Sequence, residues 1–163
     1  MAITDSELRK ANQIFDAVVD LLPEVGIKKF DPNRQDLKIT FSVTGDDFPM
    51  KFVWRIKPKQ ELISILSPFT FNFREDKIMD GMIALTAINY SLLNGSFDLD
   101  MSDGTVFFRI NTSFTGTTIT KDLLDYLVRV SANTVDNYSY RLFALNKGIS
   151  TLEEFLEWFH KDD

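Results

Sequence analysis

The sequence predicts an α+β fold in which an antiparallel sheet of about five strands carries its helices on one face. Apolar residues alternate strictly with polar ones over residues 37–56 and 97–110, as in strands with one buried face. They recur at helical spacing over residues 8–22 and 123–145. The 15 phenylalanines favour a sheet-based core over a helical bundle. The expected order is α-β-β-β-α-β-β-α-α.

Length and composition limit the architecture and the partners. A chain of 163 residues suits one domain with a sizeable core, so we expect a single domain over residues 1–163. The formal charge of −6 argues against nucleic acid and anionic membranes, which are bound largely through Lys and Arg. The sequence has no cysteine, no basic and apolar start typical of a secretory signal, and no apolar run as long as a membrane span. We therefore expect a cytoplasmic protein that binds neither nucleic acid nor membrane.

The first helix is predicted to begin at Thr4, because Thr4 and Glu7 have the spacing of a capping box. Its apolar stripe consists of Leu8, Ala11, Phe15, Val18, Val19 and Leu22. We expect this helix to end at Pro23. Residues 24–34, which include Gly26 and Pro32, are interpreted as a connecting loop.

Three strands are predicted next. Residues 37–43 and 48–56 form a hairpin around Gly45 and Asp46, with Ile39 opposite Phe52 and all alternate apolar residues on one face. The third strand covers residues 63–73. Since proline cannot donate to a sheet ladder, Pro68 predicts a bulge or an edge there.

A second helix is predicted to begin at Glu75 and to end near Gly95, which is expected to form a left-handed cap. It is apolar around much of its circumference, so it lies in the core or also packs against a second subunit. A hairpin follows with Asp103 and Gly104 in a two-residue turn, which places Leu99 opposite Phe108. Phe107 then shares the solvent face with polar neighbours.

Two helices complete the chain. Thr120 is an expected N-cap for a long helix that reaches about Gly148. Thr151 and Glu154 form a second capping box, which predicts a short, acidic extra helix over residues 151–160.

A search for catalytic or metal-binding chemistry finds no convincing candidate. His160 is the only histidine, so a multi-histidine metal site is excluded. Because it lies close to the C-terminus, we also expect no Ser-His-Asp triad. Asp98, Asp100 and Asp103 resemble the start of a calcium loop, but the sixth and twelfth positions are not Gly and Glu. We interpret Asp98 and Arg109 as a surface ion pair, and we predict no catalytic residue, no cofactor and no metal.

Apolar residues in unexpected places give the candidate partner or dimer surface. On the predicted solvent face of the sheet, and on the second helix, these residues are Val53, Leu62, Leu66, Phe107, Met82 and Ile88. Isolated apolar residues are also common on protein surfaces, so scattered exposure is the alternative interpretation.

The segment NYSLLNGSFDLDMSDGTVFFRI, with the order of elements around it, resembles the bacterial YbjN family. The resemblance covers about residues 5–148 and is carried mainly by Asn89, Asn94, Gly95, Phe97, Leu99, Gly104, Phe108 and Arg109. It implies a fold like that of type III secretion chaperones and a chaperone-like, adaptor or regulatory binding module that is often dimeric. The family has no established catalytic residues. The helix over residues 151–160 departs from the family pattern and could cover a sheet edge or occupy a binding groove.

Three functional hypotheses follow. The first is a non-enzymatic module that binds a protein partner through apolar surface as a homodimer, by accepting an amphipathic helix or a strand at a sheet edge. The second is a small-ligand sensor with an apolar pocket between the sheet and the second helix, lined by Phe, Met and Trp54. A distant third is an enzyme that uses Asp98, Asp100 and Arg109.

Overall fold

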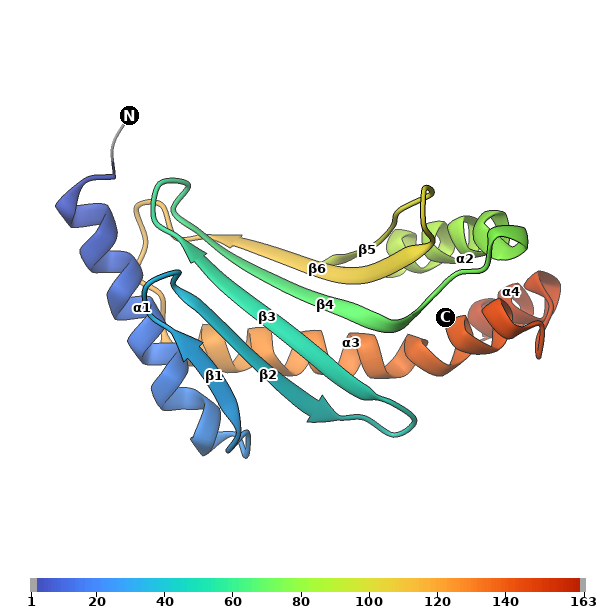
Figure 1. The fold of residues 1–163 in the computed structure, drawn as a ribbon, viewed down its shortest axis with the longest axis horizontal. Helices are drawn as coiled ribbons and strands as arrows, with labels where there is room; N and C mark the ends of the chain where they lie inside the picture. Colours follow the sequence, from blue (N-terminus) through green and yellow to red (C-terminus); the bar gives the residue numbers. More distant parts are fainter. Residues whose placement is uncertain (1–2, 162–163) are drawn as a thin grey trace.

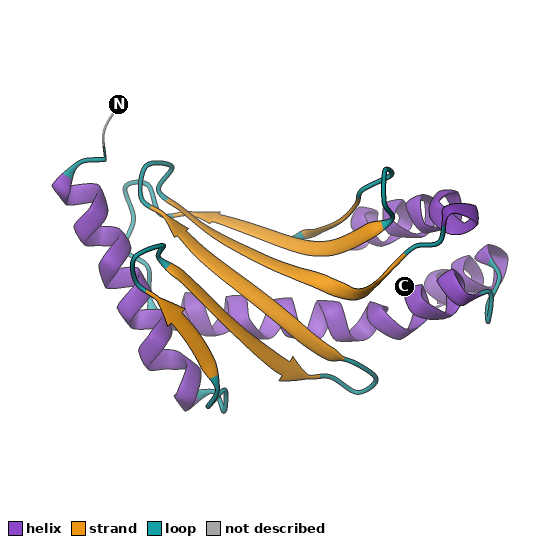
Figure 2. Cartoon of the chain, viewed as in Figure 1, coloured by secondary structure: helices purple, strands orange, loops and turns teal. Residues whose placement is uncertain are grey.

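The computed structural model describes residues 3–161 and has the predicted α+β architecture. Six antiparallel strands form one open sheet in the order β1-β2-β3-β4-β6-β5, and the long helix α3 runs behind the strands (Figures 1 and 2). In chain order the elements are α1 (Asp5–Glu24), β1 (Phe30–Asn33), β2 (Lys38–Thr44), β3 (Pro49–Lys57), β4 (Leu62–Asn72), the 3-10 turn η1 (Glu75–Lys77), α2 (Ile78–Ser91), β5 (Ser96–Leu99), β6 (Thr105–Ser113), α3 (Lys121–Lys147) and α4 (Leu152–Lys161).

Strand β1 corrects the interpretation of residues 24–34 as a loop. It pairs with β2, and Phe30 lies opposite Phe41. The strand is only four residues long and contains Pro32, so the sequence shows no clear alternation. Proline is tolerated here because β1 is an edge strand whose outer side needs no ladder partner.

Both predicted hairpin registers are wrong by two residues. Ile39 pairs with Trp54 rather than Phe52, and Leu99 pairs with Val106 rather than Phe108. The reason is that both loops are longer than the two-residue turns assumed. In the second loop, for example, the backbone N–H of Asp100 donates to the carbonyl of Thr105 at 2.8 Å. Because side chains alternate, a shift of two residues leaves every side chain on its predicted face.

The bulge predicted at Pro68 is confirmed. The pairing of β4 with β6 shifts in register between Pro68 and Asn72. The pairing of β3 with β4 ends where Val53 lies opposite Leu66, so the second half of β4 pairs with β6 alone. The sheet therefore opens between β3 and β4 at this end, as Figure 1 shows.

The predicted helix caps of α1, α3 and α4 are confirmed. Thr4 and Glu7 form a complete capping box on α1, and α1 continues one residue beyond Pro23. Thr120 caps α3, which ends at Gly148 in a left-handed conformation. On α4, the N–H of Thr151 donates to the carboxylate of Glu154, and the N–H of Glu154 donates to the hydroxyl of Thr151.

Gly95 does not cap a helix, because α2 already ends at Ser91 with Leu92 in an extended conformation. Its φ is +82°, and a Cβ atom at this position would lie 2.4 Å from the ring of Phe108. The position thus needs glycine for a close approach of the chain to β6.

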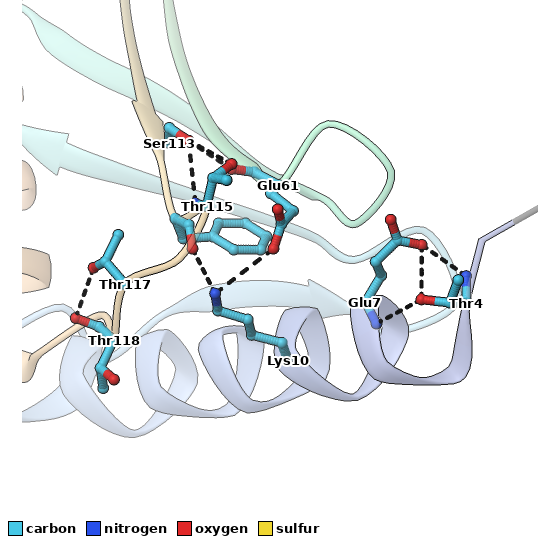
Figure 3. Close-up of polar contacts among 9 residues, drawn as sticks. Thr4, Glu7, Lys10, Glu61, Ser113, Thr115, Thr117 and Thr118 are labelled. Carbon is cyan, nitrogen blue, oxygen red and sulfur yellow. Dashed lines mark hydrogen bonds and ion pairs between the residues drawn. The ribbon is translucent and has the colours of Figure 1, made fainter.

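The core lies between the helices and one face of the sheet. Phe41, Phe52 and Trp54 are buried on that face, with Phe15 of α1 and Leu127 of α3 among the residues that cover it. Lys10 connects α1 to the end of the sheet. Its Nζ donates to the carbonyl of Phe114 and lies 3.6 Å from the carboxylate Oε1 of Glu61 (Figure 3). In Figure 1, α3 lies on the far side of the strands, and the near face carries no helix.

Gly104 offers a direct test of the β5–β6 loop. Its φ is +73°, and a Cβ atom would lie 2.1 Å from the carbonyl oxygen of Phe73. Gly116 also has a positive φ, +63°, but no atom within 4 Å of the Cβ position. Gly116→Ala should therefore lower the free energy of unfolding by about 1–2 kcal/mol through backbone strain alone. Gly104→Ala should cost at least ~1 kcal/mol more, because the backbone of Phe73 must move. Urea denaturation measures both, and equal losses would contradict the contact.

The capping box of α1 makes a prediction about pH. The backbone N–H and then the hydroxyl of Thr4 donate to Glu7 and lower the pKa of its carboxyl. A carboxyl with a lowered pKa stabilises the fold above its unfolded pKa, and this contribution is lost as the pH falls through the folded pKa. Thr4→Ala should raise the pKa of Glu7 toward its ordinary value, as measured by NMR titration of its carboxyl carbon. Thr151→Ala is the control, and it should leave Glu7 unchanged.

Candidate functional site

The six residues predicted to form a partner surface fall into three different places. Val53, Leu62, Leu66 and Phe107 lie half-buried on the helix-free face of the sheet, and Met82 is half-buried on α2. Ile88 was assigned wrongly, because its exposed fraction is 0% and it belongs to the core. The apolar circumference of α2 does not show which of its stripes faces inward, and Ile88 lies on the inward one.

On the sheet, three of the predicted residues gather near the centre. Val53 of β3 lies directly opposite Leu66 of β4. Phe107 lies opposite Pro68, and the guanidinium of Arg109 stands 5.9 Å from the centre of its ring. Leu62 is separate, at the end of β4 opposite Lys57 and Ser113.

The aspartates near this hairpin have structural partners. Asp98 forms the predicted ion pair with Arg109, at 2.6 Å, although Phe107 is its direct cross-strand neighbour. The hydroxyl and then the backbone N–H of Ser102 donate to Asp100 and lower the pKa of its carboxyl. Within residues 3–161, no group of three or more His, Cys, Asp or Glu residues could hold a metal ion.

An apolar hollow lies between α2 and α4, and we call it the helical groove. It has a volume of about 610 Å³. Tyr90 is 94% exposed, Met79 62% and Ile83 44%. The lining residues are Met79, Met82, Ile83, Thr86, Ala87, Tyr90, Phe159 and His160. Of these, sequence reasoning selected only Met82, although the unbroken apolar circumference of the second helix was the signal for the others.

The orientation of α2 is determined by Asn89. Its Nδ2 donates to the carbonyl of Phe97 at 2.9 Å, and the N–H of Phe97 donates to its Oδ1 at 2.8 Å. The amide thus pairs with both backbone groups of one residue on the edge strand β5. At the other end of α2, Gly81 packs so closely that a Cβ atom would lie 2.8 Å from the ring of Phe73. These two contacts direct Met79 and Ile83 away from the core.

Helix α4 forms the second wall of the groove. Phe155 and Phe159 are buried, and Trp158 packs edge-on against Tyr138 with the guanidinium of Arg141 4.6 Å from the centre of its ring. A second hollow, of about 630 Å³, lies along α4 and shares His160 with the groove. It is lined by Leu152, Leu156 and His160 together with Glu153 and Glu157.

Another hollow, of about 410 Å³, lies between α1 and the loop that precedes α3. Its lining includes Arg9, Lys10, Thr117 and Thr118, and it mixes polar and apolar surface about equally. The ammonium of Lys10 is already engaged by Phe114 and Glu61, as Figure 3 shows. Arg9 also lines this hollow and takes part in none of the ion pairs of residues 3–161, so its guanidinium is the charge that the hollow offers.

Comparison with protein families agrees with this arrangement. Residues 16–144 match the model of the YbjN family, which is described as "Putative bacterial sensory transduction regulator". The chain belongs to the YbjN family. This confirms the resemblance found in the sequence, whose motif residues Asn89, Gly95, Phe97 and Phe108 meet at the junction of α2, β5 and β6. Helix α4 lies outside the matched residues.

Two solved structures share the fold. The chain is similar to YbjN from E. coli, described as a putative transcription regulator, with 20% identity and a TM-score of 0.57 over 79% of this chain and 89% of that one. It is also similar to a chain of the ExsC-ExsE complex, with 10% identity and a TM-score of 0.57 over 81% of this chain and 95% of that one. A comparison with curated proteins gave no match. No helix among residues 3–161 is long and apolar enough to cross a membrane.

The contact between Asn89 and Phe97 predicts a large effect of a small change. Asn89→Ala leaves the N–H and the carbonyl of Phe97 without their partners, which should lower the free energy of unfolding by about 1–3 kcal/mol. Hydrogen exchange at the amide of Phe97 should also become faster. Asn94→Ala is the control, because Asn94 makes only a 3.4 Å contact with the hydroxyl of Tyr126. Equal stability losses in the two variants would contradict the role of Asn89.

Proposed function

We propose that this YbjN-family chain is a non-enzymatic, protein-binding regulatory or adaptor module that acts through apolar surface as a homodimer. The observation that carries the proposal is the helical groove, in which Met79, Ile83 and Tyr90 of α2 are exposed beside α4. Large contiguous apolar patches on soluble proteins often mark an interaction site, which is the reason for this proposal.

A homodimer suits the groove for a geometric reason. Two helices that expose the same apolar stripe can pack against each other about a two-fold axis, and each residue then meets its counterpart region in the other copy. Met79 and Ile83 are one helical turn apart and therefore lie on one side of α2. Contact between two such stripes would bury the surface that a single chain leaves in water.

The sheet edges are poorer sites for a partner than the groove. On β5, the amide of Asn89 occupies the backbone groups of Phe97. At the other edge, β1 has only four residues, and Pro32 provides no N–H. Strand addition, one of the two binding modes expected from the sequence, is therefore less well supported than helix-to-helix contact.

The similarity to a chain of the ExsC-ExsE complex supports the same proposal by analogy of fold, since that chain was solved as part of a protein complex. The family description as a sensory transduction regulator is compatible with a module that acts by binding.

A pair of substitutions tests the dimer. Met79→Glu with Ile83→Glu places two carboxylates in the groove, where burial against a second copy would require their desolvation. Sedimentation of the wild-type protein should show a dimer, and the double variant should weaken association at least ~100-fold. Both side chains are exposed in the single chain, so its fold should be retained.

The matched control is Met101→Glu with Ile149→Glu, which introduces the same charges at exposed positions outside the groove. It should sediment as the wild-type protein does. A wild-type protein that remains monomeric at ~1 mM, or equal effects of the two double variants, would contradict the proposal.

A small-ligand sensor is the second candidate, and one observation supports it. The volume of the groove, about 610 Å³, lies within the range of small-molecule sites. The position differs from the pocket expected from the sequence, because Trp54 is buried in the core and does not line the groove. A metabolite that raises the melting temperature of the wild-type protein but not of the Met79→Glu/Ile83→Glu variant would favour this alternative.

A further inference from the structure

The helix-free face of the sheet carries a charge opposite to that of the whole chain. From the register, its charged residues are Asp31, Lys38, Lys51, Arg55, Lys57, Asp98 and Arg109. Five of these are cationic and two are anionic, although the formal charge of the chain is −6. We call this surface the basic sheet face.

Most of its cations have no partner within the chain. Arg109 is neutralised by Asp98. None of the ion pairs formed by residues 3–161 includes Lys38, Lys51, Arg55 or Lys57. Four cations on β2 and β3 are therefore available to an external anion.

One pair of cations opposes the usual rules of sheet pairing. Lys38 lies directly opposite Arg55. Like charges in direct cross-strand positions destabilise a sheet, and the next positions in this row are the uncharged Ser64 and Asn111. A local arrangement that costs stability in the free protein is a signal of a function that uses it.

The cations flank an apolar centre. Along β3, Val53 lies between Lys51 and Arg55, which are each two residues away, or about 6.5–7 Å. Leu66 lies beside Val53, and Phe107 is in the neighbouring row. A partner that suits this pattern has acidic side chains beside apolar ones.

We propose that the basic sheet face binds an acidic segment of a partner protein that also carries apolar side chains. This inference rests on the proposed protein-binding function and names the chemistry of the partner. The apolar centre favours a peptide over nucleic acid. Single-stranded nucleic acid is bound by stacking on several aromatic rings, and of Val53, Leu66 and Phe107 only Phe107 is aromatic. At physiological salt, charges more than ~8 Å apart are screened, so a short segment responds to these cations and not to the net charge.

Fluorescence anisotropy with four defined probes tests the proposal. The first probe is a labelled peptide of about eight residues that repeats Glu-Glu-Leu-Leu, so each face of the extended chain carries both residue types, and it is long enough to span six strands. The other probes are the same peptide with Lys for Glu, the same peptide with Ser for Leu, and a single-stranded oligonucleotide. The Glu/Leu peptide should bind with a Kd below ~1 mM and should bind more weakly at high salt. The other three probes should bind at least ~10-fold more weakly.

Charge reversal locates the site. Lys38→Glu with Arg55→Glu should weaken binding of the Glu/Leu peptide at least ~10-fold. Arg9→Glu with Lys161→Glu is the control, because it changes the net charge equally at exposed positions on α1 and α4. Equal weakening by both double variants would show a general charge effect and would overturn the proposal.

A neutral substitution separates binding from stability. Lys38→Gln removes the repulsion with Arg55, so it should leave the melting temperature unchanged or raise it while it weakens peptide binding. A lower melting temperature with unchanged binding would mean that Lys38 has only a structural role.

Tighter binding of the oligonucleotide than of the Glu/Leu peptide would assign the face to nucleic acid and overturn the proposal. Sedimentation of the same samples distinguishes failure of this inference from failure of the proposed homodimer. A protein that forms a dimer but does not bind the peptide contradicts only the inference about the sheet face.

Discussion

The apolar surface that α2 exposes depends on how the amide of Asn89 pairs with the backbone of Phe97. Two hydrogen bonds to one buried edge residue leave α2 little freedom to rotate or slide along β5. With Gly81 against Phe73 at the other end, this contact directs Ala84 and Ile88 into the core and leaves Met79 and Ile83 outside. The helical groove is thus a consequence of a polar contact, and the apolar residues that line it do not create it by themselves.

The two exposed surfaces share one architectural cause. All the helices that cover the sheet pack on a single face, so the other face remains open and can carry charge (Figure 1). The helical groove is lined by α2 and α4, which lie at one end of the sheet in Figure 1, and the basic sheet face is the face that no helix covers. A second copy in the groove and a partner segment on the sheet would therefore not compete for space. Such a chain could associate with itself and bind another protein at the same time.

The sequence predicted the layers of this fold better than its contacts. The strand period of two is robust, so Val53, Leu66 and Phe107 reached the correct face even though both hairpin registers were wrong. Helix caps depend on local residues and were also predictable. Strand β1 was not predictable, since four residues that include a proline show too little alternation.

The rotation of α2 about its axis could not be predicted either. An apolar circumference does not show which side faces the core, and the hydrogen bonds between Asn89 and Phe97 determine that side. For that reason Ile88 was assigned to a surface, and Tyr90 and Met79 were missed. The basic sheet face was missed because the net charge of −6 is a sum over the whole chain and does not show that cations predominate on one face of the sheet.

The two edge strands of the sheet limit strand pairing between copies of this protein. An open antiparallel sheet with two free edges can grow by adding strands from one molecule to the next, which leads to fibres. Here β5 is closed by the side chain of Asn89, and β1 is short and interrupted by Pro32. In the homodimer that we propose, each copy covers the exposed apolar stripe of α2 in the other copy. Such an isologous pair would be closed and would not propagate, so the apolar surface would not lead to continued aggregation.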